Sequence, residues 1–147
     1  MTDHWRRLER MYHRAPVNEY FEPRLEVGEG TARIVMAVKP SSFHAGAGLH
    51  GSVFFKMLDD ACVFAVYSVE PEVFVPTTSF TVHFLRPVTG GTLEAVANVV
   101  DRAGRIYVAE GVLRCDGRPV ATGSGTFTRS SVKLSEVPGY AEPAAPS

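Results

Sequence analysis

The chain has 147 residues, of which 45% are hydrophobic and 21% charged, and its formal net charge is -1 at pH 7. This length and composition predict one globular domain with a sizeable core. The near-zero charge excludes a global positive field that would hold nucleic acid or an anionic membrane. No apolar stretch is long enough to span a bilayer, and the N-terminus lacks the apolar core of a signal peptide. We therefore expect a cytoplasmic protein whose two cysteines, Cys62 and Cys115, are reduced.

The predicted elements are a short helix, a hairpin, a long helix and a four-stranded meander. Residues 4–14 carry apolar side chains at helical spacing, and residues 51–69 are apolar over about five helical turns. Asp116-Gly117 is a strong hairpin signal. The predicted strands, bounded by glycine and proline, are 22–28, 31–39, 77–86, 91–101, 105–115 and 118–128. Residues 1–129 would form one domain, and 130–147 would be a loosely ordered tail.

The element order predicts an α+β fold. A single long helix among many strands excludes a doubly wound parallel sheet, which needs helices alternating with strands. The helix at 51–69 is apolar on every side, which is typical of a buried helix. One flat sheet covers only one face of a helix. We therefore expect an antiparallel sheet of five to six strands wrapped round this central helix.

The three charges of the predicted central helix need individual explanations. Asp60 follows Lys56 by four residues, a spacing that favours an ion pair on one face. Asp59 has apolar neighbours one turn away on both sides, so its carboxylate would be costly to bury without a partner or a function. Burial would raise its pKa toward a range useful for acid–base chemistry. The spacing leaves two interpretations open, a catalytic carboxylate or a carboxylate bonded to a neighbouring loop or subunit.

His50-Gly51-Ser52 opens the same helix, where free amides and the positive end of the helix dipole can hold a carbonyl oxygen or oxyanion. Gly51 would permit close approach of a substrate, or it would serve only to form the turn. The stretch from Gly46 to Gly51 fits G-x-G-x-x-G literally. It lacks the parallel βαβ context of a dinucleotide site, so we expect no nucleotide cofactor. The histidines form no ligand motif, and we expect no metal.

These motifs together resemble the hotdog-fold thioesterases of the phenylacetate-degradation type. That family has His-Gly-Gly followed by a carboxylate nine residues after the histidine, and here His50 is followed by Asp59 at that spacing. Its next strand ends in a sequence like FLRP, matched here by FTVHFLRP at 80–87. The final strand, with VATGSGTFTR, is also similar. The likeness covers about residues 20–129, and it implies a hotdog fold.

The resemblance also implies roles for individual residues. Asp59 would be the general base for water or the nucleophile, and the Gly51 amide would polarise the thioester carbonyl. His50 would shape the turn before the helix. Thr77, ten residues before Pro87, would orient water or the carboxylate. Because active sites of this family form between two subunits, Asp59 and Thr77 are expected to meet across a dimer interface.

Two positions depart from the family pattern. His44 stands where the family often has asparagine, and Ser52 replaces the second glycine. His44 would donate a hydrogen bond to Asp59 or the carbonyl, or else it marks a changed substrate or lost activity. Ser52, Phe80, Phe84 and Arg86 are candidate substrate-binding residues. The phenylalanines would house an acyl or aryl group or belong to the core, and Arg86 would contact CoA phosphates or be surface charge.

The leading hypothesis is hydrolysis of an acyl-CoA or arylacyl-CoA thioester to the free acid and CoA, without a cofactor. The enzyme would act as a homodimer or a dimer of dimers, because a second subunit would complete the sheet edge and the half-site. The first alternative is a non-catalytic hotdog protein that binds or senses acyl-CoA, motivated by the changes at His44 and Ser52. The second is a hotdog dehydratase, whose usual central-helix motif this chain lacks.

Overall fold

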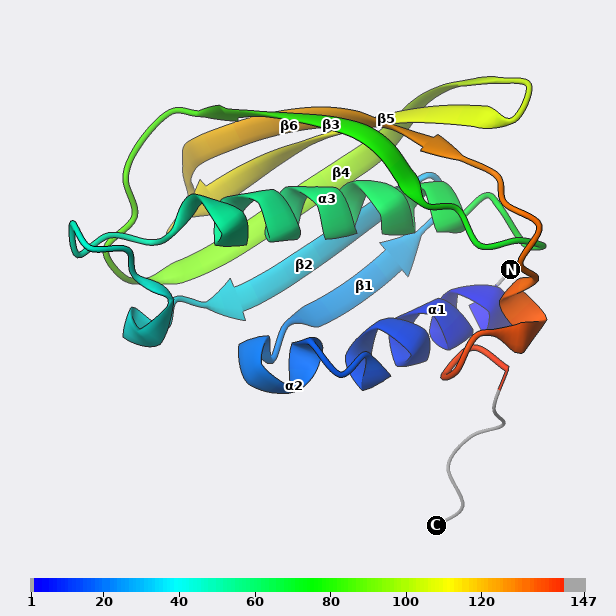
Figure 1. Cartoon of the computed structure of the whole chain (residues 1–147), viewed down its shortest axis with the longest axis horizontal. Coiled ribbons are helices and arrows are strands. Elements are labelled where there is room, and N and C mark those ends of the chain that lie inside the picture. The colour runs from blue at the N-terminus through cyan, green and yellow to red at the C-terminus, as the bar shows by residue number, and fades with distance from the viewer. Residues whose placement is uncertain (1, 142–147) are drawn as a thin grey trace, which may run out of the picture.

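The computed structural model describes residues 2–141, which form one curled sheet with a helix in its concave face (Figure 1). Two helices, α1 and α2, precede the sheet, and one long helix, α3, lies between its second and third strands. The helices are α1 (Thr2–Arg14), α2 (Asn18–Phe21) and α3 (Gly51–Tyr67), and the strands are β1 (Arg24–Gly28), β2 (Thr31–Ala37), β3 (Thr77–Phe84), β4 (Thr92–Ala103), β5 (Ile106–Cys115) and β6 (Arg118–Thr128).

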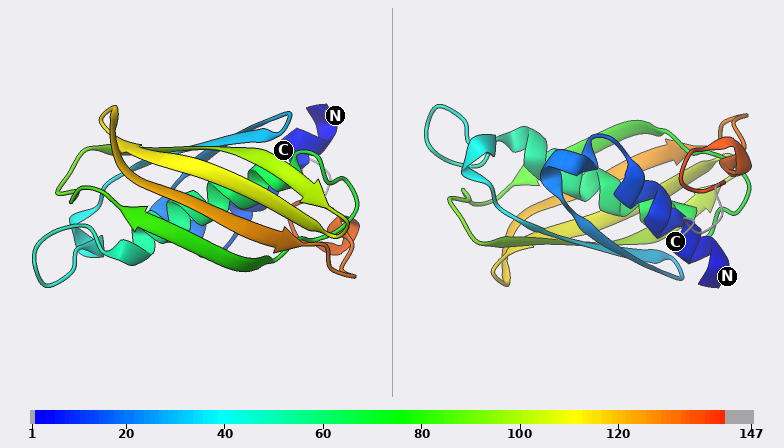
Figure 2. Two further views of the ribbon diagram at one scale, coloured as in Figure 1. Left: turned by 90° about the horizontal axis from the view of Figure 1, so that it is seen from above. Right: turned by 90° about the horizontal axis from the view of Figure 1, so that it is seen from below.

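Within the described residues the six strands form one sheet in the order β1-β2-β4-β5-β6-β3, and every neighbouring pair is antiparallel. Asp116 and Gly117 both adopt positive φ at the β5–β6 turn, as a type I′ hairpin requires. The sheet wraps round α3, which Figure 2 shows lying across the strands. The predicted α+β hotdog fold is confirmed.

The all-round apolar character of α3 has the predicted consequence. Met57, Leu58, Ala61 and Cys62 have no exposed surface, and α3 packs against strands from both halves of the sheet. These residues join inward-facing side chains of the strands in a single core cluster. The core packing therefore holds α3 in place, while its charged side chains, Lys56, Asp59 and Asp60, are only partly buried.

The two edges of the sheet differ. At the β1 edge, two side chains of α1 accept hydrogen bonds from backbone amides of the strand: Glu9 Oε2 from Val27 N at 2.9 Å and His13 Nε2 from Leu25 N at 3.0 Å. The helix therefore satisfies this edge and covers it. At the opposite edge, β3 pairs with β6 on one side only, and most of its residues are exposed.

A β-bulge reorients the start of β3. Thr77 pairs with Phe127 and Ser79 with Thr126, so Thr78 is an extra residue in the strand. Regular alternation from the inward-facing Phe80 would turn Thr77 away from α3. The bulge reverses this, because Thr78 bonds to Thr126 on the outer side while Thr77 reaches α3.

The expected loose tail is wrong for residues 130–141, which we call the C-terminal strap. Leu134 in this strap is completely buried, and the amide of Phe74 bonds to the Val132 carbonyl. Arg10 Nε on α1 donates to the Gly139 carbonyl at 2.6 Å. The strap therefore packs on the domain. Residues 142–147 of the predicted tail lie outside the described residues. Among the helices of residues 2–141, none has the length and hydropathy needed to cross a membrane.

Candidate active site

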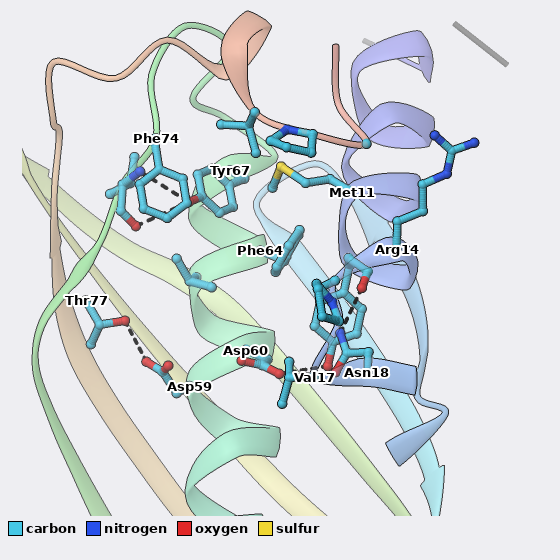
Figure 3. Close-up of a pocket in the computed structure, with 18 of the residues that line it drawn as sticks. Met11, Arg14, Val17, Asn18, Asp59, Asp60, Phe64, Tyr67, Phe74 and Thr77 are labelled. Atoms are coloured by element: carbon cyan, nitrogen blue, oxygen red, sulfur yellow. Dashed lines mark hydrogen bonds between the residues drawn. The ribbon is translucent and has the colours of Figure 1, made fainter. Parts of the chain in front are cut away.

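Asp59 lies midway along α3 and faces the bulged start of β3. The Thr77 hydroxyl donates a hydrogen bond to Asp59 Oδ1 at 2.7 Å (Figure 3). This contact forms within one chain, which corrects the expectation that the two side chains meet across a subunit interface. Burial raises the pKa of Asp59, while the Thr77 hydrogen bond opposes that rise. The site therefore holds a partly desolvated carboxylate that a hydroxyl orients.

The charges nearest to Asp59 are arranged on neighbouring faces of α3. Lys56 Nζ lies 2.6 Å from Asp60 Oδ2, which confirms the predicted pair, and the Tyr12 hydroxyl donates to the same oxygen at 2.8 Å. Asp60 raises the pKa of Asp59 and Lys56 lowers it, both less than burial does. Behind Asp59, burial raises the pKa of the Cys62 thiol to about 12, so this cysteine is not a nucleophile at neutral pH. Of the two α3 carboxylates, Asp60 is paired with Lys56, whereas Asp59 has no cationic partner at bonding distance among the described residues.

A cavity of about 800 Å³ opens beside Asp59 and Thr77 (Figure 3). This volume lies within the usual range for small-molecule sites. Its walls come from α1, α3, the α3–β3 loop and the strap, and they are mainly apolar. They include Met11, Val63, Phe64, Tyr67, Phe74 and Val137. None of these was among the predicted site residues, because helical or aromatic spacing alone does not distinguish a cavity wall from core. The arrangement can hold an apolar group next to a carboxylate.

Phe80 lies on the Asp59 side of α3 but packs as a structural residue. Its ring contacts Phe55 at a centroid distance of 5.3 Å and Phe127 at 6.4 Å. Gly123 and Gly125 on β6 make room for the ring, since a Cβ at Gly125 would lie 2.4 Å from a Phe80 carbon. Phe80 is absent from the lining of the large cavity. Of the two interpretations left open, the structure favours core packing for this residue.

The His50-Gly51-Ser52 motif caps α3 as predicted. His50 Nδ1 accepts from the Ser52 amide at 3.0 Å, and its ring also contacts the Ser52 hydroxyl at 2.7 Å. Gly51 is the first helical residue, a position whose N–H has no partner within the helix. Eight residues separate Gly51 from Asp59, which is about 12 Å along the helix axis. Within one chain the Gly51 amide and the Asp59 carboxylate therefore cannot act on the same carbonyl.

Gly51 lies instead at a second, more open cavity of about 460 Å³. Phe84, His44 and Arg86 also line it. The Phe84 ring is 58% exposed and packs over Gly51 and against Phe54. His44 Nδ1 accepts from the Gly46 amide at 2.9 Å, so His44 shapes its own loop and makes no contact with Asp59. The predicted site residues are thus divided between two places on the chain.

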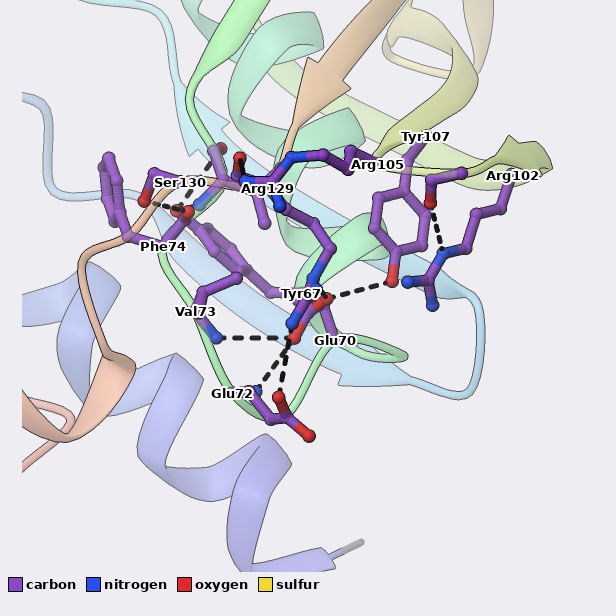
Figure 4. A network of polar contacts seen from close by, with 12 residues as sticks. Tyr67, Glu70, Glu72, Val73, Phe74, Arg102, Arg105, Tyr107, Arg129 and Ser130 are labelled. Carbon is purple, nitrogen blue, oxygen red and sulfur yellow. Dashed lines mark hydrogen bonds and ion pairs between the residues drawn. The ribbon is translucent and has the colours of Figure 1, made fainter.

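Glu70 is a buried acid that the sequence did not reveal (Figure 4). It is 2% exposed, and its oxygens accept from Arg129 Nε at 2.7 Å and from the Tyr107 hydroxyl at 3.1 Å. The backbone amides of Glu72 and Val73 also donate to it. Burial raises the pKa of Glu70, but these hydrogen bonds outweigh it and lower the pKa overall. The network fixes the loop that leads from α3 to Thr77.

No group of three or more His, Cys, Asp or Glu side chains within residues 2–141 is placed to hold a metal ion. The polar groups described above are carboxylates, hydroxyls and amides. At the large cavity they include the Asp59 carboxylate and the Thr77 hydroxyl, and at the smaller one the first amide of α3. Such groups suit proton transfer and carbonyl polarisation.

Residues 47–127 match the family model of the thioesterase superfamily, and the chain belongs to this superfamily. The match includes the capped start of α3, Asp59 and Thr77. Membership supports hydrolysis of a thioester as the general activity. A search of curated proteins found no match.

Solved structures show the same fold. A thioesterase family protein from Silicibacter pomeroyi is 27% identical, with a TM-score of 0.75 over 83% of this chain and 96% of that one. The E. coli PaaI protein of the phenylacetic acid degradation operon is 22% identical, with a TM-score of 0.79 over 90% and 96% of the two chains. A mutant of the phenylacetic acid degradation protein PaaI from Thermus thermophilus is 23% identical, with a TM-score of 0.72 over 79% and 100%. The predicted resemblance to hotdog thioesterases is confirmed at the level of superfamily and fold.

Proposed function

We propose that this protein hydrolyses an acyl-CoA thioester to a carboxylic acid and CoA, with Asp59 as the central catalytic group. The observation that carries this proposal is the partly buried Asp59 carboxylate, which is held by Thr77 and lines a mainly apolar cavity. A thioester is an activated acyl group, so one positioned base and one polarising amide suffice for its hydrolysis.

In the general-base route, Asp59 takes a proton from water while the water oxygen bonds to the thioester carbon. The carbon–sulfur bond then breaks, and the CoA thiolate receives the proton. In the nucleophilic route, the Asp59 carboxylate bonds to the thioester carbon and the carbon–sulfur bond breaks, which releases the CoA thiolate and leaves an Asp59–acyl anhydride. Water then hydrolyses the anhydride, frees the carboxylic acid and supplies the proton that the thiolate takes up. The Thr77 hydroxyl orients the carboxylate in both routes. Single-turnover hydrolysis in ¹⁸O-labelled water tests for the nucleophilic route, because label in Asp59 with unlabelled acid arises only when water attacks the Asp59 carbonyl of the anhydride, whereas the general-base route always labels the acid.

A second copy of the chain would complete the site. The helix-start amide needed to polarise the carbonyl lies about 12 Å along α3 from Asp59 of the same chain. The β3 edge is exposed and has one strand partner, so it is suited to pairing with the same edge of another copy. In the proposed homodimer, or dimer of dimers, Gly51 of one copy serves Asp59 of the other. Native mass measurement tests the assembly.

The proposed CoA carrier would enter past the smaller cavity. Arg86 lines this cavity beside Gly51, and its Nη1 donates to the Pro119 carbonyl at 2.6 Å, which leaves other guanidinium donors for a phosphate. Arg118 begins β6 one residue before Pro119. Charge removal in Arg86→Gln should raise KM for acyl-CoA more than for the matching acyl-pantetheine, which lacks the nucleotide phosphates.

Free-thiol release from a panel of acyl-CoAs tests the activity directly. Asp59→Asn should lower kcat by at least about a hundredfold, because the amide cannot accept the proton. Asp60→Asn is the matched control, because Asp60 already bonds to Lys56 and Tyr12. The fall in kcat for this variant should be far smaller than for Asp59→Asn. Equal activity of the wild type and Asp59→Asn would refute the role of Asp59.

The alternative is a hotdog protein that binds acyl-CoA without turnover. It is favoured by one observation, the engagement of His44 with its own loop instead of with Asp59. Calorimetric titration with a non-hydrolysable acyl-CoA analogue measures binding independently of turnover. Tight binding without thiol release from any natural acyl-CoA would select this alternative.

A further inference from the structure

We infer that the two ends of the chain together determine which acyl group is accepted, and that they select a large apolar one. This inference rests on the proposed function. Residues 137–139 of the strap and Met11 of α1 line the large cavity at the end away from Asp59. Figure 3 shows Met11, Tyr67 and Phe74 gathered at that end.

The depth of the cavity follows from the positions of its residues on α3. Asp59 lies at the reacting end, and Val63, Phe64 and Tyr67 follow along the same helix. Tyr67 is eight residues beyond Asp59, which is about 12 Å along the axis. The Tyr67 hydroxyl accepts from the Val75 amide at 3.2 Å, so the ring is held in place at the far end. An acetyl group would leave most of this space empty, whereas a long acyl chain would fill it.

Hydrogen bonds hold the strap firmly against α1 at the far end of the cavity. Arg10 Nε bonds to the Gly139 carbonyl at 2.6 Å, and Arg7 Nη1 bonds to the Tyr140 carbonyl at 3.1 Å. The Tyr140 hydroxyl lies 2.7 Å from His4 Nδ1, and the other ring nitrogen of His4 lies 2.7 Å from the Tyr67 carbonyl. The strap is therefore bonded to α1, and α1 in turn to the end of α3.

The parts of the far wall that come from α1 and the strap lie outside the segment that matches the superfamily, whereas Tyr67 and Phe74 lie inside it. Residues 47–127 contain Asp59 and Thr77, whereas Met11 and residues 137–139 precede and follow that segment. The proposed reacting centre therefore lies inside the matched segment, and this part of the far wall lies outside it. Because apolar burial contributes about fourfold in binding for each methylene group, this wall should set the preferred acyl length.

The test measures kcat/KM by free-thiol release for straight-chain acyl-CoAs from acetyl to dodecanoyl. In the wild type, the ratio of the dodecanoyl to the acetyl value should exceed about ten. Val137→Phe fills the far end in the full chain and should shift the optimum to a shorter acyl group, with at least a tenfold fall in that ratio. A chain that ends after Glu136 lacks the wall and should show a rise of about tenfold in KM for dodecanoyl-CoA.

A chain that ends after Ala141 is the matched control and should keep the wild-type profile. Unchanged profiles in both Val137→Phe and the Glu136-terminated chain, with hydrolysis intact, would overturn this inference and leave the proposed function standing. A wild type that prefers acetyl-CoA would also overturn it. A wild type that hydrolyses no acyl-CoA would overturn the proposed function and, with it, the inference.

Discussion

The Thr77 hydroxyl and Asp59 Oδ1 lie 2.7 Å apart, joining the edge strand β3 to the middle of α3. The β-bulge at Thr78 makes this contact possible, because it turns Thr77 toward the helix. A strand irregularity of one residue therefore sets the orientation of the proposed catalytic carboxylate.

Thr77→Val should shift the pH dependence of activity. The Thr77 hydrogen bond lowers the pKa of Asp59 against the effect of burial, so its loss should raise that pKa further. The base is active when deprotonated. The acid limb of the kcat/KM profile should therefore move to higher pH in Thr77→Val, while Thr78→Val, which alters an outward-facing hydroxyl, should leave it in place. Identical acid limbs in wild type and Thr77→Val would contradict this account.

Gly51→Pro removes one amide hydrogen and should leave the helix intact. Proline is favoured at the first helical position, and His50 before it has the extended conformation that proline requires. Loss of one oxyanion donor should lower kcat by about a hundredfold or more, without a large fall in thermal stability.

The same variant tests the shared site. In a heterodimer of Gly51→Pro and Asp59→Asn, one of the two sites carries both changes and the other carries neither. Refolding an equal mixture of the two inactive variants should restore about a quarter of wild-type activity, because about half of the dimers are mixed. A mixture as inactive as its components would mean that both groups act within one copy.

Asp59→Asn should stabilise the protein at neutral pH. Burial raises the folded-state pKa of Asp59 above its ordinary value of 3.8, so ionisation costs stability as the pH rises from that value through the folded pKa. The amide avoids this cost and still accepts from Thr77. Urea unfolding should show a higher free energy of unfolding for Asp59→Asn than for wild type at pH 7, and this gain should disappear near pH 3. A variant less stable than wild type at pH 7 would show that the carboxylate stabilises the fold.

Glu70→Gln should strongly destabilise the protein. All the partners of Glu70 described above are hydrogen-bond donors, so the NH₂ group of the glutamine side chain would face at least one donor. The ion pair to Arg129 would also be lost. We expect a loss of about 3 kcal/mol at pH 7. Because the pKa of Glu70 is lowered in the folded state, its contribution is present above the unfolded pKa and is lost as pH falls through the folded one.

Glu72→Gln is the control, because Glu72 is the exposed partner of the same arginine and should contribute little. Urea unfolding of both variants at pH 7 and pH 3.5 checks the pair. The gap between wild type and Glu70→Gln should narrow at the lower pH, and a constant gap would assign the loss to packing instead of charge.

Much of the fold was predictable because its signals are local. The apolar periodicity of residues 4–14, the uniformly apolar α3 and the Asp116-Gly117 turn each encode their own conformation. The helix and strand bounds differ from the predictions by a few residues at most. The four-residue helix α2 was missed, since one turn has no periodicity to detect.

The site was predictable only in part, because its geometry depends on contacts between distant segments. Spacing within α3 singled out Asp59, but no local pattern places the bulge at Thr78 or the wall at Val137. Glu70 lies between Val69 and Pro71 in a stretch that resembles an exposed loop, and its burial depends on Arg129, 59 residues away. Leu134, Val137 and Tyr140 recur every three residues, a weak signal that the strap is packed.

The unequal edges of the sheet limit how further strands can add to it. Glu9 and His13 occupy the amides of β1, so this side of the sheet offers no template for another strand. Growth of the sheet is then limited to β3. If two copies pair through β3 about a two-fold axis, each copy uses its single open sheet edge. No open edge then remains for a third copy. By covering the β1 edge, the N-terminal helix would thus prevent further copies from adding strands there and would limit the size of the assembly.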